Sequence, residues 1–152
     1  MTNKRRLLLK AMLALAAGGS SILSVTKAVA SWPKAAFEAN KQASVLQSLY
    51  GDLPLTASEA INIKVAKIAE NGLSVPVSVE SDLPEIESIS LVVPNNPFPL
   101  AAHFEHRKNT LGYASVRIKM AKSSDVIAVV KSQGKLYSAS RPVKVTLGGC
   151  GG

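Results

Sequence analysis

Alternation of apolar and polar residues dominates the chain from residue 61 onward. In the segment 61–65 (INIKV) the two kinds strictly alternate, and in 113–120 the polar Ser115, Arg117 and Lys119 face away from the apolar residues. A period of two is typical of a strand with one buried face. Interrupted by turn residues, this pattern predicts about eight short strands, at 61–65, 75–80, 86–93, 100–104, 113–120, 125–130, 135–139 and 142–147.

Short strands that each have one apolar face indicate two sheets packed against each other. We therefore predict an all-β fold, a two-sheet sandwich. Pro76 falls inside the second strand. Because proline cannot donate to a strand ladder and is found mainly at sheet edges, this strand is expected at an edge.

One helix is predicted before the strands. Residues 34–50 contain neither glycine nor proline, and Gly51 provides a stop. A period of 3.6 residues places several apolar side chains near one face of this helix. These are Phe37, Ala43, Leu46, Leu49 and Tyr50.

The first thirty residues have the layout of a cleavable export signal. A basic start precedes an apolar stretch at 11–25 and the small residues of 28–30 (AVA), which predict cleavage after Ala30. A membrane anchor is the alternative, but the apolar stretch is short for a span and is interrupted by glycine and serine.

The basic start also resembles the twin-arginine export motif. Arg5 and Arg6 are followed by leucines and by Lys10, although Lys4 stands where the motif has Ser or Thr and Leu8 where it often has Phe. This resemblance implies export to the periplasm by the twin-arginine route, which usually carries proteins that are already folded.

Charge at first suggests a nucleic-acid partner, since the chain has a formal net charge of +8. Without residues 1–30 there remain 13 Lys and Arg against 10 Asp and Glu, a net charge of +3, and no nucleic-acid partner is expected. The remainder is uneven, at −5 over 31–105 and +8 over 106–152. Either the two halves interleave and neutralise each other, or a basic surface faces an anion or an acidic partner. The candidates for such contacts lie on polar strand faces: Arg117, Lys119, Arg141 and Lys144.

The only cysteine, Cys150, lies between two pairs of glycines, Gly148-Gly149 and Gly151-Gly152. A single cysteine excludes an internal disulfide framework and a cysteine-cluster metal site. Glycine on both sides predicts a mobile arm that can enter a narrow pocket. No His, Lys or Arg lies within five residues of Cys150 to activate its thiol. Cys150 is therefore interpreted as a carrier thiol that is activated inside other proteins.

Other roles for the tail are possible from the residues alone. An odd cysteine in an exported protein can form an intermolecular disulfide, which would make this chain a structural or adaptor protein. The terminal Gly151-Gly152 also resembles ubiquitin-like carriers, which bear sulfur as a C-terminal thiocarboxylate. Those carriers work in the cytoplasm, so the export signal and Cys150 argue against this function.

No bound metal or cofactor is predicted. His103 and His106 are three residues apart in a strand followed by a loop, so their side chains are expected to point apart. No segment resembles the nucleophile elbow of a serine hydrolase.

The segment 145–152 (VTLGGCGG) resembles the C-terminal signature of SoxY, the sulfur-carrier subunit of the bacterial thiosulfate-oxidising Sox system. Further stretches agree with this family in the same order and extend the resemblance over the whole mature chain. They are 69–72 (AENG) with 75–77 (VPV), 96–100 (NPFPL) with Ala102 and Phe104, and 117–121 (RIKMA) leading to Val126.

The resemblance implies an immunoglobulin-like domain over 31–147, between the signal peptide at 1–30 and a swinging GGCGG arm at 148–152. It implies a heterodimer with a SoxZ-like sandwich protein, and a heme-containing SoxAX-like enzyme that couples thiosulfate to Cys150 as a cysteine S-thiosulfonate. A SoxB-like dimanganese hydrolase would release sulfate, and a SoxCD-like sulfane dehydrogenase is a further expected partner. SoxY itself would catalyse none of these steps.

Overall fold

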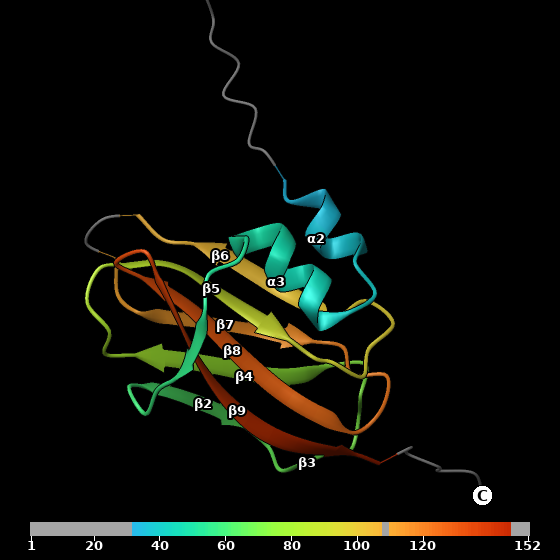
Figure 1. Ribbon diagram of the computed structural model, residues 1–152. Helices are drawn as coiled ribbons and strands as arrows, with labels where there is room; N and C mark the ends of the chain where they lie inside the picture. The colour runs from blue at the N-terminus through green and yellow to red at the C-terminus, as the bar shows by residue number, and fades with distance from the viewer. Residues whose placement is uncertain (1–31, 108–109, 147–152) are drawn as a thin grey trace, which may run out of the picture. The chain divides into compact units, whose positions relative to one another are not determined.

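The computed structural model describes residues 32–107 and 110–146 (Figure 1). The predicted export signal, with Arg5, Arg6 and the cleavage site after Ala30, and the GGCGG segment lie outside these residues. Two short helices precede nine strands in the described part of the chain. The elements are α2 (Lys34–Glu38), α3 (Gln42–Tyr50), β1 (Leu55–Ala57), β2 (Ile61–Val65), β3 (Ile68–Ala69), β4 (Val75–Ser81), β5 (Ile86–Val92), β6 (Leu100–Glu105), β7 (Tyr113–Ile118), β8 (Ser124–Ser132) and β9 (Lys135–Val145).

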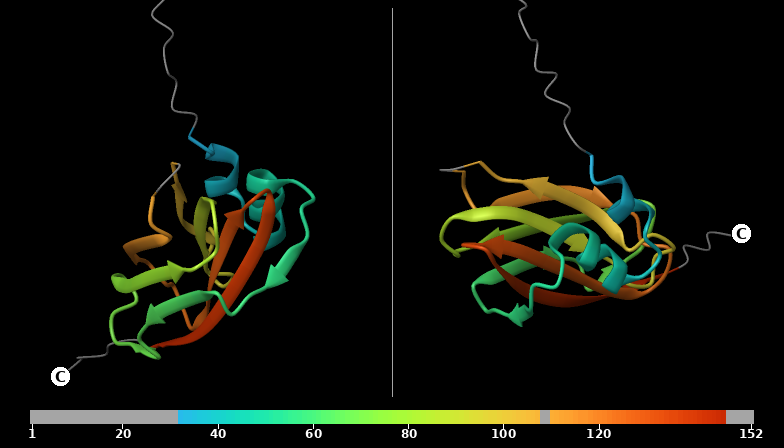
Figure 2. Two further views of the ribbon diagram at one scale, coloured as in Figure 1. Left: turned by 90° about the vertical axis from the view of Figure 1, so that its left-hand side faces the viewer. Right: turned by 45° about the horizontal axis from the view of Figure 1, so that its top comes forward.

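Two sheets form a sandwich, which confirms the predicted fold class. The larger sheet has the order β1-β9-β8-β5-β6, with β3 also paired to β9, and the smaller sheet has the order β2-β4-β7. All pairings are antiparallel except those of β1 and β3, which run parallel to β9. Both α2 and α3 pack on the outer face of the larger sheet (Figure 2).

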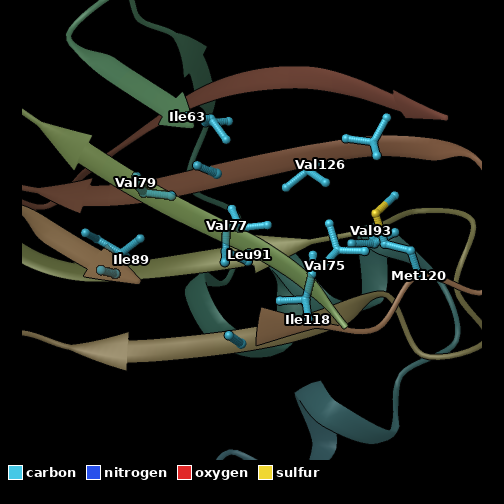
Figure 3. Close-up of a cluster of buried hydrophobic side chains, with 14 of the residues drawn as sticks. Ile63, Val75, Val77, Val79, Ile89, Leu91, Val93, Ile118, Met120 and Val126 are labelled. Carbon is cyan, nitrogen blue, oxygen red and sulfur yellow. The ribbon is translucent and has the colours of Figure 1, made fainter. Parts of the chain in front are cut away.

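Alternation in the strands builds the core between the sheets (Figure 3). Val75, Val77 and Val79 of β4 are at most 1% exposed and pack in one cluster with Ile89 and Leu91 of β5. Burial of a side chain of this size stabilises the fold by about 1.5–3 kcal/mol. The apolar faces predicted from the sequence are therefore the faces that hold the sheets together.

The last two predicted strands form one continuous strand, β9. Pro142, which was expected to begin a new strand, lies opposite Asp125 in an uninterrupted ladder with β8. Two strands were missed, because β1 has three residues and β3 only two, too few to show a period.

The prediction of an edge strand around Pro76 was wrong. Pro76 lies in β4, which is the central strand of the smaller sheet. The pairing of β4 with β2 ends at Val77, however, so that Pro76 is paired only with Arg117 of β7. A proline is tolerated here because one side of the strand has no ladder at that residue.

The predicted helix over 34–50 is two helices, because residues 39 and 41 are extended. The buried side chains explain the break. Ala36 and Val45 are nine residues apart, which would place them on opposite faces of one straight helix. Both are fully buried in one cluster against the larger sheet, so the chain has to change direction between them.

A polar contact attaches α3 to the larger sheet. The Tyr50 hydroxyl lies 2.7 Å from Oγ of Ser90, which lies 2.8 Å from Nδ1 of His103. Ser90 is fully buried, so these hydrogen bonds satisfy groups that water cannot reach. Burial raises the pKa of Tyr50 and lowers the pKa of His103, although the carboxylate of Glu105 opposes the second shift.

The lowered pKa of His103 predicts acid sensitivity. Below an ordinary histidine pKa of about 6.5, the unfolded chain takes up a proton that the folded protein resists. The free energy of unfolding should therefore fall as the pH decreases from 6.5 toward the lower pKa of the folded state. Urea unfolding at several pH values measures this slope, and His103→Gln should reduce it. The control His106→Gln should retain the contribution of His103, and an unchanged slope in His103→Gln would contradict the assignment.

Candidate functional site

Cys150 and the glycines Gly148, Gly149, Gly151 and Gly152 lie outside the described residues. The structure instead defines where this segment begins, because β9 ends at Val145 and Thr146 is the last described residue before it. We call residues 144–146 the root. Its place beside β3 is visible in Figure 1.

The root is fixed from both sides. Ile68 and Ala69 of β3 pair in parallel with Lys144 and Val145. Three backbone N–H groups of the root donate hydrogen bonds to neighbouring loops: Lys144 N to Lys67 O (2.9 Å), Val145 N to Ser123 Oγ (2.9 Å) and Thr146 N to Ala69 O (3.1 Å). The chain is therefore held in place up to Thr146, four residues before Cys150.

Two loops are hydrogen-bonded to the root, and a third loop is hydrogen-bonded to one of them. We call the three loops the collar: residues 66–74, 94–99 and 119–124. Asn96 joins two of them, since its Nδ2 donates to Lys119 O (2.7 Å) and its Oδ1 accepts from Ala121 N (2.9 Å). Met120 N donates to Gly72 O (2.7 Å) and joins the third. The stretches 69–72, 96–100 and 117–121, which carried the family resemblance, thus all contribute to the collar.

At position 72 of the collar there is no space for a side chain. A Cβ on this residue would lie 2.5 Å from the carbonyl oxygen of Met120 and 2.9 Å from Cγ1 of Val145. Both distances are well below van der Waals contact, and the first atom belongs to the backbone. Only glycine lets the loop approach the root this closely.

A groove with a volume of about 800 Å³ lies beside the root, where β2 crosses the ends of β8 and β9. Its apolar lining comes from Ile63, Val65 and Val143, and its basic lining from Lys64, Lys67, Arg141 and Lys144. Asp125 is the one acidic residue that lines it. Lys64 forms a salt bridge with Glu80 (2.6 Å), whereas no described carboxylate forms one with the other three bases. The groove therefore combines positive charge with an apolar lining.

The four basic residues predicted from the sequence are not all brought together. Arg141 and Lys144 line the groove, whereas Arg117 lies on the exposed face of β7, 3.4 Å from Ser74 Oγ. Lys119 belongs to the collar. Sequence analysis missed Lys64 and Lys67, because they come from the acidic half of the chain. Lys64 lies on β2, which packs against β9, and Lys67 lies beside β3, which pairs with Lys144 and Val145.

Ion pairs between described residues do little to neutralise the two oppositely charged halves. Among the described residues, one salt bridge joins them, between Lys131 Nζ and Glu87 Oε2 (2.7 Å). The hydrogen bond from Lys131 lowers the pKa of Glu87. Most of the positive charge of the second half is left at the surface, part of it in the groove.

The two histidines take no part in the groove. His103 is hydrogen-bonded to Ser90, and Nδ1 of His106 is buried without a hydrogen-bond partner among the described residues. Over residues 32–107 and 110–146, no three His, Cys, Asp or Glu side chains form a cluster suited to a metal ion. None of the described helices is long and apolar enough to cross a membrane.

Comparison with known proteins identifies the family. Residues 46–150 match the family model described as "Sulfur oxidation protein SoxY". The structure of the sulfur carrier protein SoxY from Chlorobium limicola f thiosulfatophilum is similar, with 40% sequence identity and a TM-score of 0.65. The match covers 70% of this chain and 97% of the Chlorobium chain.

A more distant likeness concerns the fold alone. The superoxide reductase (neelaredoxin) from Ignicoccus hospitalis has a TM-score of 0.52 at 17% identity, covering 58% of this chain and 81% of that chain. Comparison with the curated proteins gives no match.

The fold is a two-sheet sandwich. Its last strand ends in the hydrogen-bonded root, and a glycine-flanked cysteine follows in the sequence. These features are typical of a carrier domain. The chain belongs to the SoxY family of sulfur carriers, which confirms the resemblance found in the sequence.

Replacement of Gly72 tests the collar. Gly72→Ala should lower the free energy of unfolding by about 1–3 kcal/mol, because the new Cβ forces Met120 or Val145 to move. Urea unfolding measures this loss, and hydrogen exchange at the amides of Val145 and Thr146 should accelerate. The neighbouring exposed Leu73→Ala is the control and should change stability by about 0.5 kcal/mol or less. Equal stability of both variants would contradict the steric role of Gly72.

Proposed function

We propose that this chain is an exported, periplasmic carrier that holds thiosulfate-derived intermediates covalently on Cys150 and presents them to the enzymes of the Sox system. Membership of the SoxY family supports a sulfur-carrier role. The observation that carries the proposal is the position of the only thiol, between glycine pairs and four residues beyond a root that the collar holds in place. A fixed root with a short chain beyond it can offer a thiol to several enzymes in turn.

The loading step joins the Cys150 thiol to the sulfane sulfur of thiosulfate. The products are a cysteine S-thiosulfonate, one proton and two electrons, and the electrons pass to a heme-containing SoxAX-like enzyme. Water then cleaves the bond between the sulfane and sulfonate sulfurs in a SoxB-like dimanganese hydrolase. This releases sulfate and two protons and leaves a persulfide anion on Cys150.

In this scheme the chain presents the bound sulfur group to the enzymes and does not catalyse the reactions itself, in agreement with a family of carrier proteins. A SoxZ-like sandwich protein is the proposed partner subunit, and a SoxCD-like sulfane dehydrogenase is a further enzyme that would act on the remaining sulfur. The sulfur cargo is the only group that we propose Cys150 to carry.

The groove supports this function through its charge. Thiosulfate and the S-thiosulfonate are both anions, and Lys67, Arg141 and Lys144 have no salt bridge to a described carboxylate. Positive charge next to the root raises the local concentration of such anions. The apolar lining at Ile63, Val65 and Val143 suits the weakly hydrated sulfur atoms of the same cargo.

The twin-arginine motif supports the proposed route of export. That route carries folded proteins, so the sandwich and a bound SoxZ-like subunit could cross together. Removal of residues 1–30, with Arg5 and Arg6, would then leave a mature chain that begins at Ser31.

Loss of the thiol tests the carrier role. The protein is incubated with thiosulfate and the SoxAX-like enzyme and its intact mass is measured. We expect a thiosulfonate adduct on the wild-type chain and none on Cys150→Ser. A stable disulfide dimer as the functional form, restored in Cys150→Ser by a chemical crosslink, would instead favour an adaptor protein. An unmodified thiol under all turnover conditions would falsify the carrier proposal.

Removal of charge tests the groove. Tetrathionate transfers a thiosulfonate group to the Cys150 thiolate and releases thiosulfate, without an enzyme. In Arg141→Gln/Lys144→Gln this reaction should slow by about two- to fivefold at low ionic strength and less at high salt. The reaction with neutral iodoacetamide should keep its rate, as should both reactions in the control Arg117→Gln. Equal slowing with both reagents would contradict an electrostatic role.

A further inference from the structure

The three loops of the collar carry exposed apolar and basic side chains, which we together call the root face: Ile68, Leu73, Phe98, Lys119 and Lys122. Ile68 is 56% exposed, Leu73 76% and Phe98 58%. Exposed apolar side chains on neighbouring loops are a common feature of protein contact sites. Since the hydrogen bonds of the collar hold these loops together, the root face is preformed.

The length of the chain beyond the root limits where an enzyme can meet the thiol. Four residues lead from Thr146 to Cys150, and an extended chain advances at most about 3.6 Å per residue. The Cα of Cys150 therefore stays within about 14 Å of Thr146. An active site that takes in Cys150 has to come close to the root, so its entrance must contact the surface that surrounds the root.

Charge on the collar indicates what such an entrance looks like. Lys119 and Lys122 are exposed and form no salt bridge with a described carboxylate. Lys67 adds a third positive charge, and Glu70 is the one acidic residue of the three collar loops. The surface is thus apolar and positively charged, and a partner that fits it is apolar and negatively charged.

We propose that the root face is the docking surface for the enzymes that act on Cys150, and that it fits an active-site entrance with apolar side chains inside a rim of carboxylates. This inference rests on the proposed carrier function and adds to it. The groove serves the anionic cargo, whereas the root face serves the enzyme. The short chain explains why both lie at the same end of the domain.

Steady-state kinetics test the docking surface without the loading enzyme. The carrier, with its SoxZ-like subunit bound, is loaded with tetrathionate, and sulfate release by the SoxB-like hydrolase is measured. Ile68→Ser/Leu73→Ser should raise KM about tenfold with little change in kcat, because buried apolar contact is lost. Lys119→Glu/Lys122→Glu should also raise KM and should weaken its increase with salt.

The matched control is Leu111→Ser, which removes an apolar side chain that is 84% exposed on the loop between β6 and β7. Because the collar contains the loop between β5 and β6, Leu111 lies at the opposite end of the strands, and its replacement should leave KM unchanged. A loaded peptide of residues 146–152 provides a second control. It has the thiol but no root face, so its KM should exceed that of the whole carrier.

Either of two kinetic results would overturn the docking surface and leave the proposed function intact: values of KM for the root-face variants within twofold of the wild type, or equal efficiency of the peptide and the whole carrier. Loss of the SoxZ-like subunit from the variants in native mass spectrometry would also overturn it, since the root face would then be the subunit interface. Absence of sulfate release from the loaded wild-type carrier would contradict the proposed function, and this inference with it.

Discussion

The clamping of the end of β9 is the interaction on which the functional end of this molecule depends. β8 pairs with the strand on one side and β3 on the other, and hydrogen bonds from residues 144–146 reach two separate loops. Ser123 accepts one of these hydrogen bonds through its side chain and Ala69 another through its backbone carbonyl, while Gly72 leaves the space that the close approach requires. The sandwich core in turn fixes the strands that carry these loops. Stability of the domain and placement of the root are therefore achieved by the same packing.

Electrostatics then distinguish this end from the rest of the surface. Contact of β2 with β9 brings Lys64, and pairing of β3 with β9 brings Lys67, from the acidic half to the groove that Arg141 and Lys144 of the basic half also line. Lys64 has a carboxylate partner in Glu80, whereas no salt bridge to a described carboxylate neutralises the others. A carrier of anionic sulfur intermediates benefits from such charge beside the root, since it favours both the cargo and acidic partners. The fixed root, the basic groove beside it and the short segment of four residues that leads to Cys150 thus all belong to the same end of the domain.

Much of this arrangement could be predicted from the sequence, because strand alternation is a local signal. The strand at 61–65 was predicted to the residue, and the family was identified from the tail and three interior stretches. The errors come from interactions between distant segments. The break at residues 39–41 follows from the sheet surface that Ala36 and Val45 share, and Pro76 is tolerated centrally because β2 ends early. Lys64 and Lys67 were missed because only the contacts of β2 and β3 with β9 bring them to the groove.

Position-specific isotope labelling tests the central claim most directly. Thiosulfate labelled in either its sulfane or its sulfonate sulfur is supplied to the carrier with its loading enzyme and hydrolase, and the tryptic peptide of residues 145–152 is analysed by mass spectrometry. The sulfane label should stay on Cys150 after hydrolysis, while the sulfonate label should appear in free sulfate. Absence of both labels from this peptide throughout turnover would contradict a carrier function for Cys150.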